Sequence, residues 1–320
     1  MKRIAVLTSG GDSPGMNAAI RAVVRTGTSM GIEVIGVRQG FQGLVEGNFT
    51  LMDTQSVSGI INMGGTILHS ARSMDFKTEP GFNQAVENLE QNGINGLVVI
   101  GGNGSQTGNY QLHSRANFPV IGVASTIDND LYGSDYTIGF DTAVNTALES
   151  IDRLRDTATS HDRIFVIEVM GRSRGFVALH AGIAGGAEVV LIPELKWELE
   201  EVTAVIKTGN KRGKKSLLIV VAEGAADGAQ LAKDIEKEIG VETRATILGH
   251  VQRGGTPTAY DRLLASQLGS FSVKFLVSGV RGVLVGELNS TISTTPLEEV
   301  FSKDKPLDPE HLELVRVLGT

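Results

Sequence analysis

Two short apolar runs in this chain each end in a pair of glycines, with polar residues close behind. The first run, Arg3–Leu7, leads into Thr8–Gly15, and the second, Leu97–Ile100, leads into Gly101–Ser105. A helical pattern follows each turn, from Met16 to about Ser29 in the first case. Short buried strands that pass through a tight turn into a helix are the building units of parallel α/β sheets. Ligands of such sheets bind beyond the carboxyl ends of the strands. We therefore expect the two turns to lie next to each other at the carboxyl-end edge of a single sheet.

The turn Gly101-Gly102-Asn103-Gly104-Ser105 has the chemistry of an anion-binding loop. Glycine adopts positive φ and lets another group approach the backbone closely, and free N–H groups at the start of a helix attract anions. These properties indicate phosphate binding, with Asn103 in contact with a metal or a phosphate. An ordinary glycine-rich turn is the other interpretation of this segment taken alone. Neither turn matches Gly-x-Gly-x-x-Gly or the P-loop, because the glycine spacing differs and no Lys-Ser/Thr follows.

Short β-branched runs alternate with longer helical patterns along the rest of the chain. This alternation predicts parallel sheets covered by helices on both faces. A helix is expected at 140–156, where apolar residues recur at helical spacing, and a surface loop from about Ser302 precedes a final helix at Pro309–Leu318. The 320 residues suffice for two domains. Further strands are expected at Glu33–Val37, Val120–Val123, Ile164–Val169, Val189–Ile192, Leu217–Val221 and Gly282–Val285.

Composition narrows the class of protein. The net charge of −7 argues against a nucleic-acid partner but allows a local basic pocket for an anionic substrate. No run approaches the ~20 apolar residues of a membrane span, and the first residues lack the apolar region of a signal peptide. Without cysteine the chain has no disulfide, no thiolate nucleophile and no cysteine-bound metal. We therefore expect a cytoplasmic protein with no membrane partner.

Polar clusters follow several of the other expected strands. The segment Ser125–Asp130 carries two carboxylates, Asp128 and Asp130, which can divide the roles of base and cation ligand. An Asx-rich turn is the alternative interpretation of that segment alone. The remaining clusters are Met170-Gly171-Arg172, Ala222-Glu223-Gly224 and Leu248–Gly255.

Five basic residues in or near these clusters form a set suited to a phosphate monoester, because arginine recognises phosphate through paired hydrogen bonds. Each arginine alone is more often a solvated surface charge. The histidine has no carboxylate partner nearby in sequence, which favours contact with a phosphate or a sugar hydroxyl over a role as base. The set consists of Arg163, Arg172, Arg244, His250 and Arg253.

Taken together, these segments resemble the bacterial ATP-dependent 6-phosphofructokinases. The resemblance implies an α/β fold of two doubly wound, mainly parallel three-layer domains. It assigns 1–139 with 252–320 to a larger nucleotide-binding domain and 140–251 to a smaller sugar-phosphate-binding domain, in a homotetramer with sites shared between subunits. The motifs run in family order from Lys2 to about Gly286: Leu7–Asn17, Gly64–Thr66, Ala71-Arg72, Gly101–Ser105, Thr126–Asp130, Arg155–Ala158, Met170–Arg172, Ala184–Glu188 and Gly249–Gly255.

The resemblance also implies a reaction, the transfer of a phosphoryl group from MgATP to the 1-hydroxyl of fructose 6-phosphate in glycolysis. Asp128 matches the general base, and Arg72 and Arg172 match positions that stabilise the transferred charge, with Thr126 in the same set. The ATP site is matched by Gly11, Arg72, Ser73, Gly102, Asn103, Gly104 and Ser105. The sugar-phosphate site is matched by Thr126, Asp128, Met170, Gly171, Arg172, Glu223, His250 and Arg253, and by Arg163 and Arg244 from a neighbouring subunit.

The chain departs from the family pattern in four places. Asn103 stands where an aspartate usually serves Mg²⁺, and Asp130 is the nearby carboxylate that compensates. Arg174 and Phe176 stand where the family commonly has a small residue and an aspartate, and Ala124-Ser125 replaces Pro-Gly. Thr54 and Gly59 replace an arginine and an aspartate of the effector site, which leaves regulation by ADP or phosphoenolpyruvate open. The matched effector residues are Arg21, Arg25, Arg155, Glu188, Arg212, Lys214 and Lys215.

Two alternatives to an ATP-dependent kinase remain. Pyrophosphate-dependent relatives tend to carry aspartate where Gly104 stands and lysine where Ser125 stands, whereas the small residues here leave room for a nucleotide. A catalytically weak binding or regulatory paralogue is suggested by Asn103. It is opposed by the retained Asp128 and Arg72, since a decayed site has no need of its base.

Overall fold

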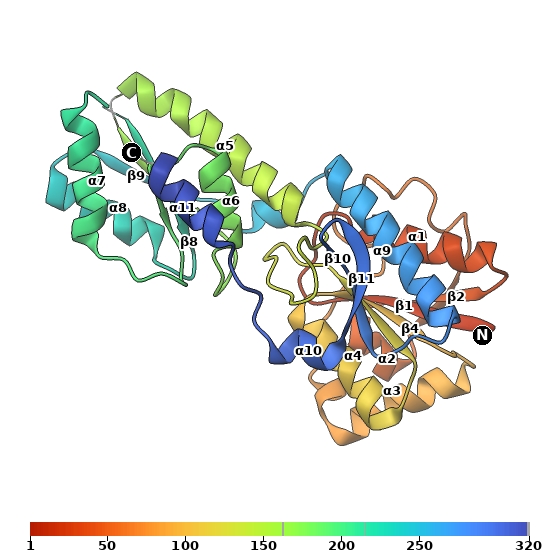
Figure 1. The fold of residues 1–320 in the computed structure, drawn as a ribbon. Coiled ribbons are helices and arrows are strands. Elements are labelled where there is room, and N and C mark those ends of the chain that lie inside the picture. The colour runs from red at the N-terminus through yellow and green to blue at the C-terminus, as the bar shows by residue number, and fades with distance from the viewer. Residues whose placement is uncertain (162, 215, 319–320) are drawn as a thin grey trace. The chain divides into compact units, whose positions relative to one another are not determined.

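The computed structural model of the protein describes residues 1–161, 163–214 and 216–318 (Figure 1). Contacts within the chain divide it into two compact units. Unit 1 consists of Met1–Asp141 and Arg253–Lys305, and unit 2 consists of Thr142–Gln252 together with the described residues from Pro306 onward. Each unit contains one sheet with helices on both of its faces, as the alternating pattern predicts.

Unit 1 is built on a seven-stranded sheet in the order β11-β10-β5-β4-β1-β2-β3. The outer strands β3 and β11 pair antiparallel to their neighbours, and the pairs between the other strands are parallel. The central strands are almost wholly buried, which is why their sequences read as continuous apolar runs. The strands are β1 (Arg3–Ser9), β2 (Glu33–Val37), β3 (Phe49–Met52), β4 (Leu97–Gly101), β5 (Val120–Ala124), β10 (Val283–Leu288) and β11 (Thr291–Pro296).

Helices cover both faces of this sheet (Figure 1). Helices α1 (Met16–Ser29) and α9 (Ala259–Val277) pack against each other on one face. Helices α2 (Gly40–Glu46), α3 (Glu79–Gln91) and α4 (Asn103–Ala116) lie on the other, with α10 (Leu297–Ser302) beside α4. The short 3₁₀ turn η1 (Asp75–Lys77) precedes α3. One apolar core joins the buried strands to these helices.

Unit 2 contains a four-stranded parallel sheet in the order β7-β8-β6-β9. One face packs on α7 and α8 through residues such as Val166, Ile219 and Ile206, and the other packs on α6, where Gly182 lies against Val190. The strands are β6 (Ile164–Val169), β7 (Val189–Leu191), β8 (Leu217–Ala222) and β9 (Thr243–Ile247). The helices are α5 (Phe140–His161), α6 (Phe176–Ala184), α7 (Leu199–Lys211), α8 (Gly228–Ile239) and α11 (Pro309–Leu318), with the 3₁₀ turn η2 (Gly249–Arg253) after β9.

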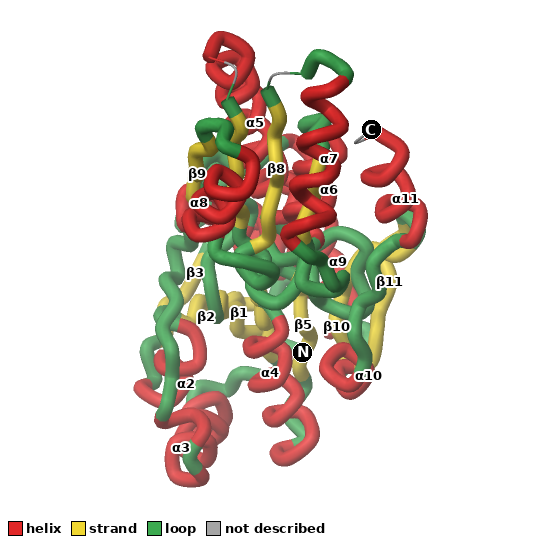
Figure 2. Tube along the Cα trace, turned by 90° about the vertical axis from the view of Figure 1, so that its left-hand side faces the viewer, coloured by secondary structure: helices red, strands yellow, loops and turns green. Residues whose placement is uncertain are grey.

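The C-terminal helix belongs to unit 2, whereas the sequence-based division placed 252–320 in the larger domain. Its predicted bounds, Pro309–Leu318, match α11. However, α11 packs on α6 of unit 2 (Figure 2), and the ring centroids of His180 on α6 and His311 on α11 lie 4.9 Å apart. Composition carries no mark of this return, because the loop that precedes the helix, from about Ser302, does not indicate which unit the helix joins.

The strands β3, β9 and β11 were not predicted from the sequence. All three lie at the edge of a sheet, where a strand needs no continuous apolar run, and their burial patterns are mixed. Strand β9 exposes Arg244 and Ala245. Among the described residues, every helix is too short or too polar to cross a membrane.

Candidate functional site

Three strand ends lie side by side in unit 1. Ser9 at the end of β1 pairs with Gly101 of β4, and Gly101 pairs with Ala124 of β5. The two glycine turns and the segment Ser125–Asp130 therefore leave the sheet at one edge. A Cβ added to Gly101 would lie 2.6 Å from both the Ser9 carbonyl oxygen and Ser105 Oγ. The prediction that the two turns leave one sheet side by side is thus confirmed, and glycine is needed at position 101, where they meet.

The three turns also contact one another through side chains. Ser13 Oγ and Ser125 Oγ are 2.8 Å apart and both are buried. The Asn103 amide donates to the Asp130 carbonyl oxygen at 3.4 Å. Ser105 Oγ is buried at the start of α4 and has no hydrogen-bond partner within the described part of the chain. The arrangement is a compact polar edge with an unused hydroxyl at the predicted phosphate turn.

Arg253 reaches this edge from the last residue of η2. Its Nη1 donates to the Asp12 carbonyl oxygen at 3.3 Å, and a Cβ on Gly11 would lie 2.4 Å from the same nitrogen. The guanidinium therefore lies directly against the first glycine turn. A cation placed over a backbone turn of this kind favours an anionic ligand.

Asp128 is the most enclosed carboxylate of the predicted set, with 3 % of its surface exposed. Its backbone N–H donates to Thr126 Oγ1 at 3.2 Å. The next residue, Asn129, adopts a left-handed φ of 52°, and its side chain accepts from the Thr137 N–H at 3.0 Å and donates to the Asp135 carbonyl at 3.0 Å. These bonds fix the backbone on both sides of Asp128, as positioning a proton acceptor requires.

Asn103 and Asp130 are the residues predicted to hold a magnesium ion. Both are partly exposed, and both offer oxygen donors, which Mg²⁺ prefers. Within the described residues, no group of three His, Cys, Asp or Glu side chains is placed to hold a metal. Asn103 and Asp130 are thus the residues that would hold Mg²⁺ at this edge, an ion that keeps several waters and binds together with phosphates.

Arg72 and Ser73 lie in the loop before η1. Arg72 is exposed, whereas the Ser73 hydroxyl donates to Gln42 Oε1 at 2.7 Å and accepts from the Phe76 N–H at 3.0 Å. Ser70 Oγ donates to the Gly10 carbonyl at 2.6 Å, which ties the same loop to the first glycine turn. Arg72 is thus carried by a loop anchored at the polar edge, while the Ser73 hydroxyl already has partners on α2 and η1.

Unit 2 has its own polar edge, at the carboxyl ends of β6 and β8, where Val169 pairs with Ala222. Glu223 follows β8, and its Oε1 accepts from the N–H groups of Gly171 at 3.2 Å and Arg172 at 2.8 Å. Both residues have positive φ, 142° and 54°. Glu223 therefore holds the unusual backbone turn that carries Arg172. Met170 is buried beside it, and His250 is exposed in η2.

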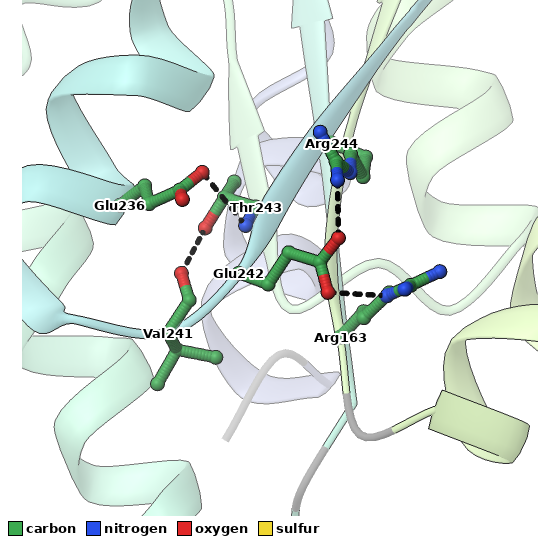
Figure 3. A network of polar contacts seen from close by, with 6 residues as sticks. All are labelled: Arg163, Glu236, Val241, Glu242, Thr243 and Arg244. Atoms are coloured by element: carbon green, nitrogen blue, oxygen red, sulfur yellow. Dashed lines mark hydrogen bonds and ion pairs between the residues drawn. The ribbon is translucent and has the colours of Figure 1, made fainter.

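Arg163 and Arg244 are held together by a carboxylate that the sequence analysis did not identify (Figure 3). Glu242 Oε2 accepts from Arg163 Nε at 2.7 Å, and Glu242 Oε1 pairs with Arg244. The hydrogen bond from Arg163 is the main cause that lowers the pKa of Glu242. One negative charge between two positive ones leaves the cluster cationic, so it still suits an anion.

These two arginines lie at the opposite end of the sheet from Met170–Arg172. Arg163 precedes the first residue of β6, and Arg244 pairs with Phe165 near that same end. Six strand residues separate the ends, and at about 3.3 Å each they span roughly 20 Å. Thr126, Asp128 and Arg253 of the predicted sugar-phosphate site belong to unit 1. The strand-end residues predicted for that site in unit 2 are divided between the two ends of its sheet.

Comparison with known proteins identifies the family. The model of the phosphofructokinase family matches residues 3–276. The chain belongs to the phosphofructokinase family. A relative from Thermus thermophilus named ATP-dependent 6-phosphofructokinase 1 is 54 % identical over 321 residues, with both chains covered completely. The ATP-dependent 6-phosphofructokinase of Natranaerobius thermophilus is 54 % identical over 319 residues, again with complete coverage of both.

A solved phosphofructokinase from Saccharomyces cerevisiae is similar in structure, with a TM-score of 0.85 and 40 % identity. The match covers 99 % of this chain and 46 % of the longer yeast chain. The predicted family and the phosphofructokinase-like α/β fold are both confirmed by these matches.

The predicted effector residues lie in both units. Arg21 and Arg25 belong to α1. In unit 2, Arg155 donates to the carbonyl oxygens of Gly185 and, at 2.9 Å, Gly186. Glu188 accepts from the Leu218 N–H at 2.8 Å and lies 3.7 Å from Lys214 Nζ. Arg212 is exposed, and Lys215 lies outside the described residues.

Proposed function

We propose that this phosphofructokinase transfers the γ-phosphoryl group of ATP to the 1-hydroxyl of fructose 6-phosphate and releases fructose 1,6-bisphosphate and ADP. The observation that carries this proposal is the buried carboxylate of Asp128 at the edge where two glycine turns leave the same sheet. The relatives with 54 % identity over the full length are named for ATP as donor. A location in the cytoplasm belongs to the same proposal.

In this reaction Asp128 accepts the proton of the sugar 1-hydroxyl as that oxygen attacks phosphorus. The N–H groups of Gly102, Asn103 and Gly104 and the hydroxyl of Ser105 bind the phosphates of ATP. Arg72 and Arg172 stabilise the charge of the transferred group. Mg²⁺ neutralises the phosphates when it is bound, and Asn103 and Asp130 would hold it. Catalysis then consists mainly of positioning and electrostatic stabilisation, as phosphoryl transfer requires.

ATP is favoured over pyrophosphate as the donor by the space at the second glycine turn. A Cβ added to Gly104 would meet no atom within 4 Å, and Ser125 is a small buried residue bonded to Ser13. Steady-state rates with each donor, at saturating fructose 6-phosphate, test this choice. A higher kcat/KM with pyrophosphate would refute the choice of donor, and no turnover with either donor would favour a binding paralogue.

We also propose a homotetramer in which Arg163 and Arg244 complete the sugar-phosphate site of a neighbouring subunit. This proposal is supported by the distance along β6, roughly 20 Å, that separates these two arginines from Met170–Arg172. Unit 1 then binds chiefly the nucleotide and unit 2 chiefly the sugar phosphate. An effector role stays part of this proposal for Arg21, Arg25, Arg155, Glu188, Arg212, Lys214 and Lys215.

Subunit mixing tests the shared site. Arg163→Ala and Asp128→Asn chains should each be inactive or nearly so, but a mixed tetramer should contain some sites in which both residues are intact. Activity should return when the two are refolded together, and a mixture of Asp128→Asn with Arg172→Ala is the control. A complete lack of recovery in verified mixed tetramers would contradict shared sites.

A further inference from the structure

The loop between β6 and α6 carries the predicted sugar-phosphate residues and has an unfavourable backbone. Gly171 and Arg172 have φ values of 142° and 54°, and the second lies in a region that side chains other than glycine rarely adopt. Such a conformation persists only when surrounding contacts hold it. Glu223 supplies two of these contacts at the start of the loop.

A second carboxylate holds the other end of the loop. Glu194, which follows β7, accepts from the Gly175 N–H through Oε1 at 3.1 Å. The same oxygen lies 3.4 Å from Arg174 Nε, and the two side chains are only 19 % and 20 % exposed. A Cβ on Gly175 would lie 2.4 Å from Ile192 and 2.9 Å from Glu194 Oε2. The loop is therefore packed directly on the segment that carries Glu194.

Glu194 also supplies a hydrogen-bond acceptor and a negative charge that the start of helix α6 lacks. Helix α6 begins after Gly175, without a side-chain cap and without an acidic residue in its first turn. The four N–H groups at a helix start need acceptors, and negative charge there is stabilising. Phe176 and Arg174 are two of the departures from the family pattern noted above, and the Arg174 guanidinium lies 5.7 Å from the Phe176 ring centroid. A carboxylate from another loop supplies the acceptor and balances the added cation.

We propose that Glu194 is a positioning residue for fructose 6-phosphate binding. It fixes the Gly175 peptide, and it keeps the charge of Arg174 paired beside α6 rather than directed at substrate phosphate. Glu194 and Glu223 together hold the two ends of the loop, so that Arg172 keeps the backbone conformation from which it acts. The kinetic consequence of this inference rests on the proposed function, whereas the structural role does not.

The structural role is tested without substrate by amide hydrogen exchange. Glu194→Ala removes the acceptor of the Gly175 N–H, so exchange in peptides covering 170–176 should accelerate by about tenfold, the equivalent of one hydrogen bond. Glu238→Gln is the matched control, because Glu238 forms an exposed ion pair with Lys207 at 3.3 Å in the same unit. Unchanged exchange in Glu194→Ala would overturn the role of Glu194 in holding the loop.

The kinetic role is tested with Glu194→Gln, Arg174→Met and the double variant. Glu194→Gln should raise KM for fructose 6-phosphate by about threefold to tenfold, while kcat and KM for ATP change less than about twofold. The double variant should bind the sugar phosphate better than Glu194→Gln alone, because it also removes the cation with which Glu194 pairs. Additive effects, or equal increases in both KM values, would overturn the inference. Wild-type protein without phosphofructokinase activity would instead refute the proposed function, and the exchange measurement would still decide the structural role.

Discussion

Two glycines of the turn after β4 should respond in opposite ways to the same substitution. Gly104 is exposed near the start of α4, and an added Cβ would meet no atom within 4 Å. Gly104→Ala should therefore raise the free energy of unfolding by about 0.5–1 kcal/mol, because alanine loses less backbone freedom in a helix. For a unit of this size that corresponds to an increase in Tm of about 1–4 °C.

The same methyl group should weaken nucleotide binding. It would occupy the space that the proposed function gives to ATP, and inserting a methyl into a fitted site costs about 1–3 kcal/mol. KM for ATP should rise by about fivefold to more than a hundredfold, whereas KM for fructose 6-phosphate should change little. The Gly104→Ala variant should therefore be more stable than the wild type and bind ATP more weakly.

Gly101→Ala is the contrasting variant. Its Cβ would lie 2.6 Å from the Ser9 carbonyl oxygen in the neighbouring strand, so the backbone itself must shift. We expect a loss of about 1–3 kcal/mol and a lower Tm. Calorimetric unfolding and steady-state kinetics of both variants provide the measurements. A Gly104→Ala enzyme with wild-type KM for ATP would place the nucleotide elsewhere, and a fall in its Tm would refute the open space at this position.

Three further predictions concern charged and amide side chains. Asp128→Asn should lower kcat by about 10²–10⁴ with little change in fructose 6-phosphate binding, and near-normal turnover would rule Asp128 out as the base. Asn103→Asp should lower the Mg²⁺ concentration at half-maximal rate, because a charged oxygen replaces a neutral one; an unchanged or higher requirement would contradict this. The lowered pKa of Glu242 means that its carboxylate stabilises the fold above its ordinary pKa of 4.5, and this contribution fades as pH falls through the lowered value. The difference in Tm between wild type and Glu242→Gln should thus be largest near pH 7 and shrink below about pH 4.5, and a difference that grows in acid would contradict the assignment.

The sequence predicted those parts of the fold that local patterns determine. Buried strands such as Glu33–Val37 and Ile164–Val169 match the structure at both ends, because both faces are covered and each strand has only one charged residue, Glu33 or Glu168. Edge strands such as β9 show no such run. The glycine turns and Asp128 were found because each follows a strand directly.

Residues that act through distant contacts could not be found in this way. Glu242 pairs with Arg163 across 79 positions, and nothing near either residue indicates the pair. Glu194 lies 19 positions from the Gly175 N–H that it accepts. The packing of α11 on α6 is likewise a long-range contact with no local signal.

The order of strands in unit 1 has a consequence for synthesis of the chain on the ribosome. Strand β5 (Val120–Ala124) pairs on one side with β4, but its other neighbour, β10, comes only at Val283–Leu288, after all four strands of unit 2. At translation rates of 5–20 residues per second, roughly 8–30 s pass between the synthesis of β5 and the synthesis of β10. The nascent sheet therefore has an open hydrogen-bonding edge, which invites pairing with other chains. Nascent-chain folding and the demand for chaperones should centre on β5 until α9 and β10 emerge.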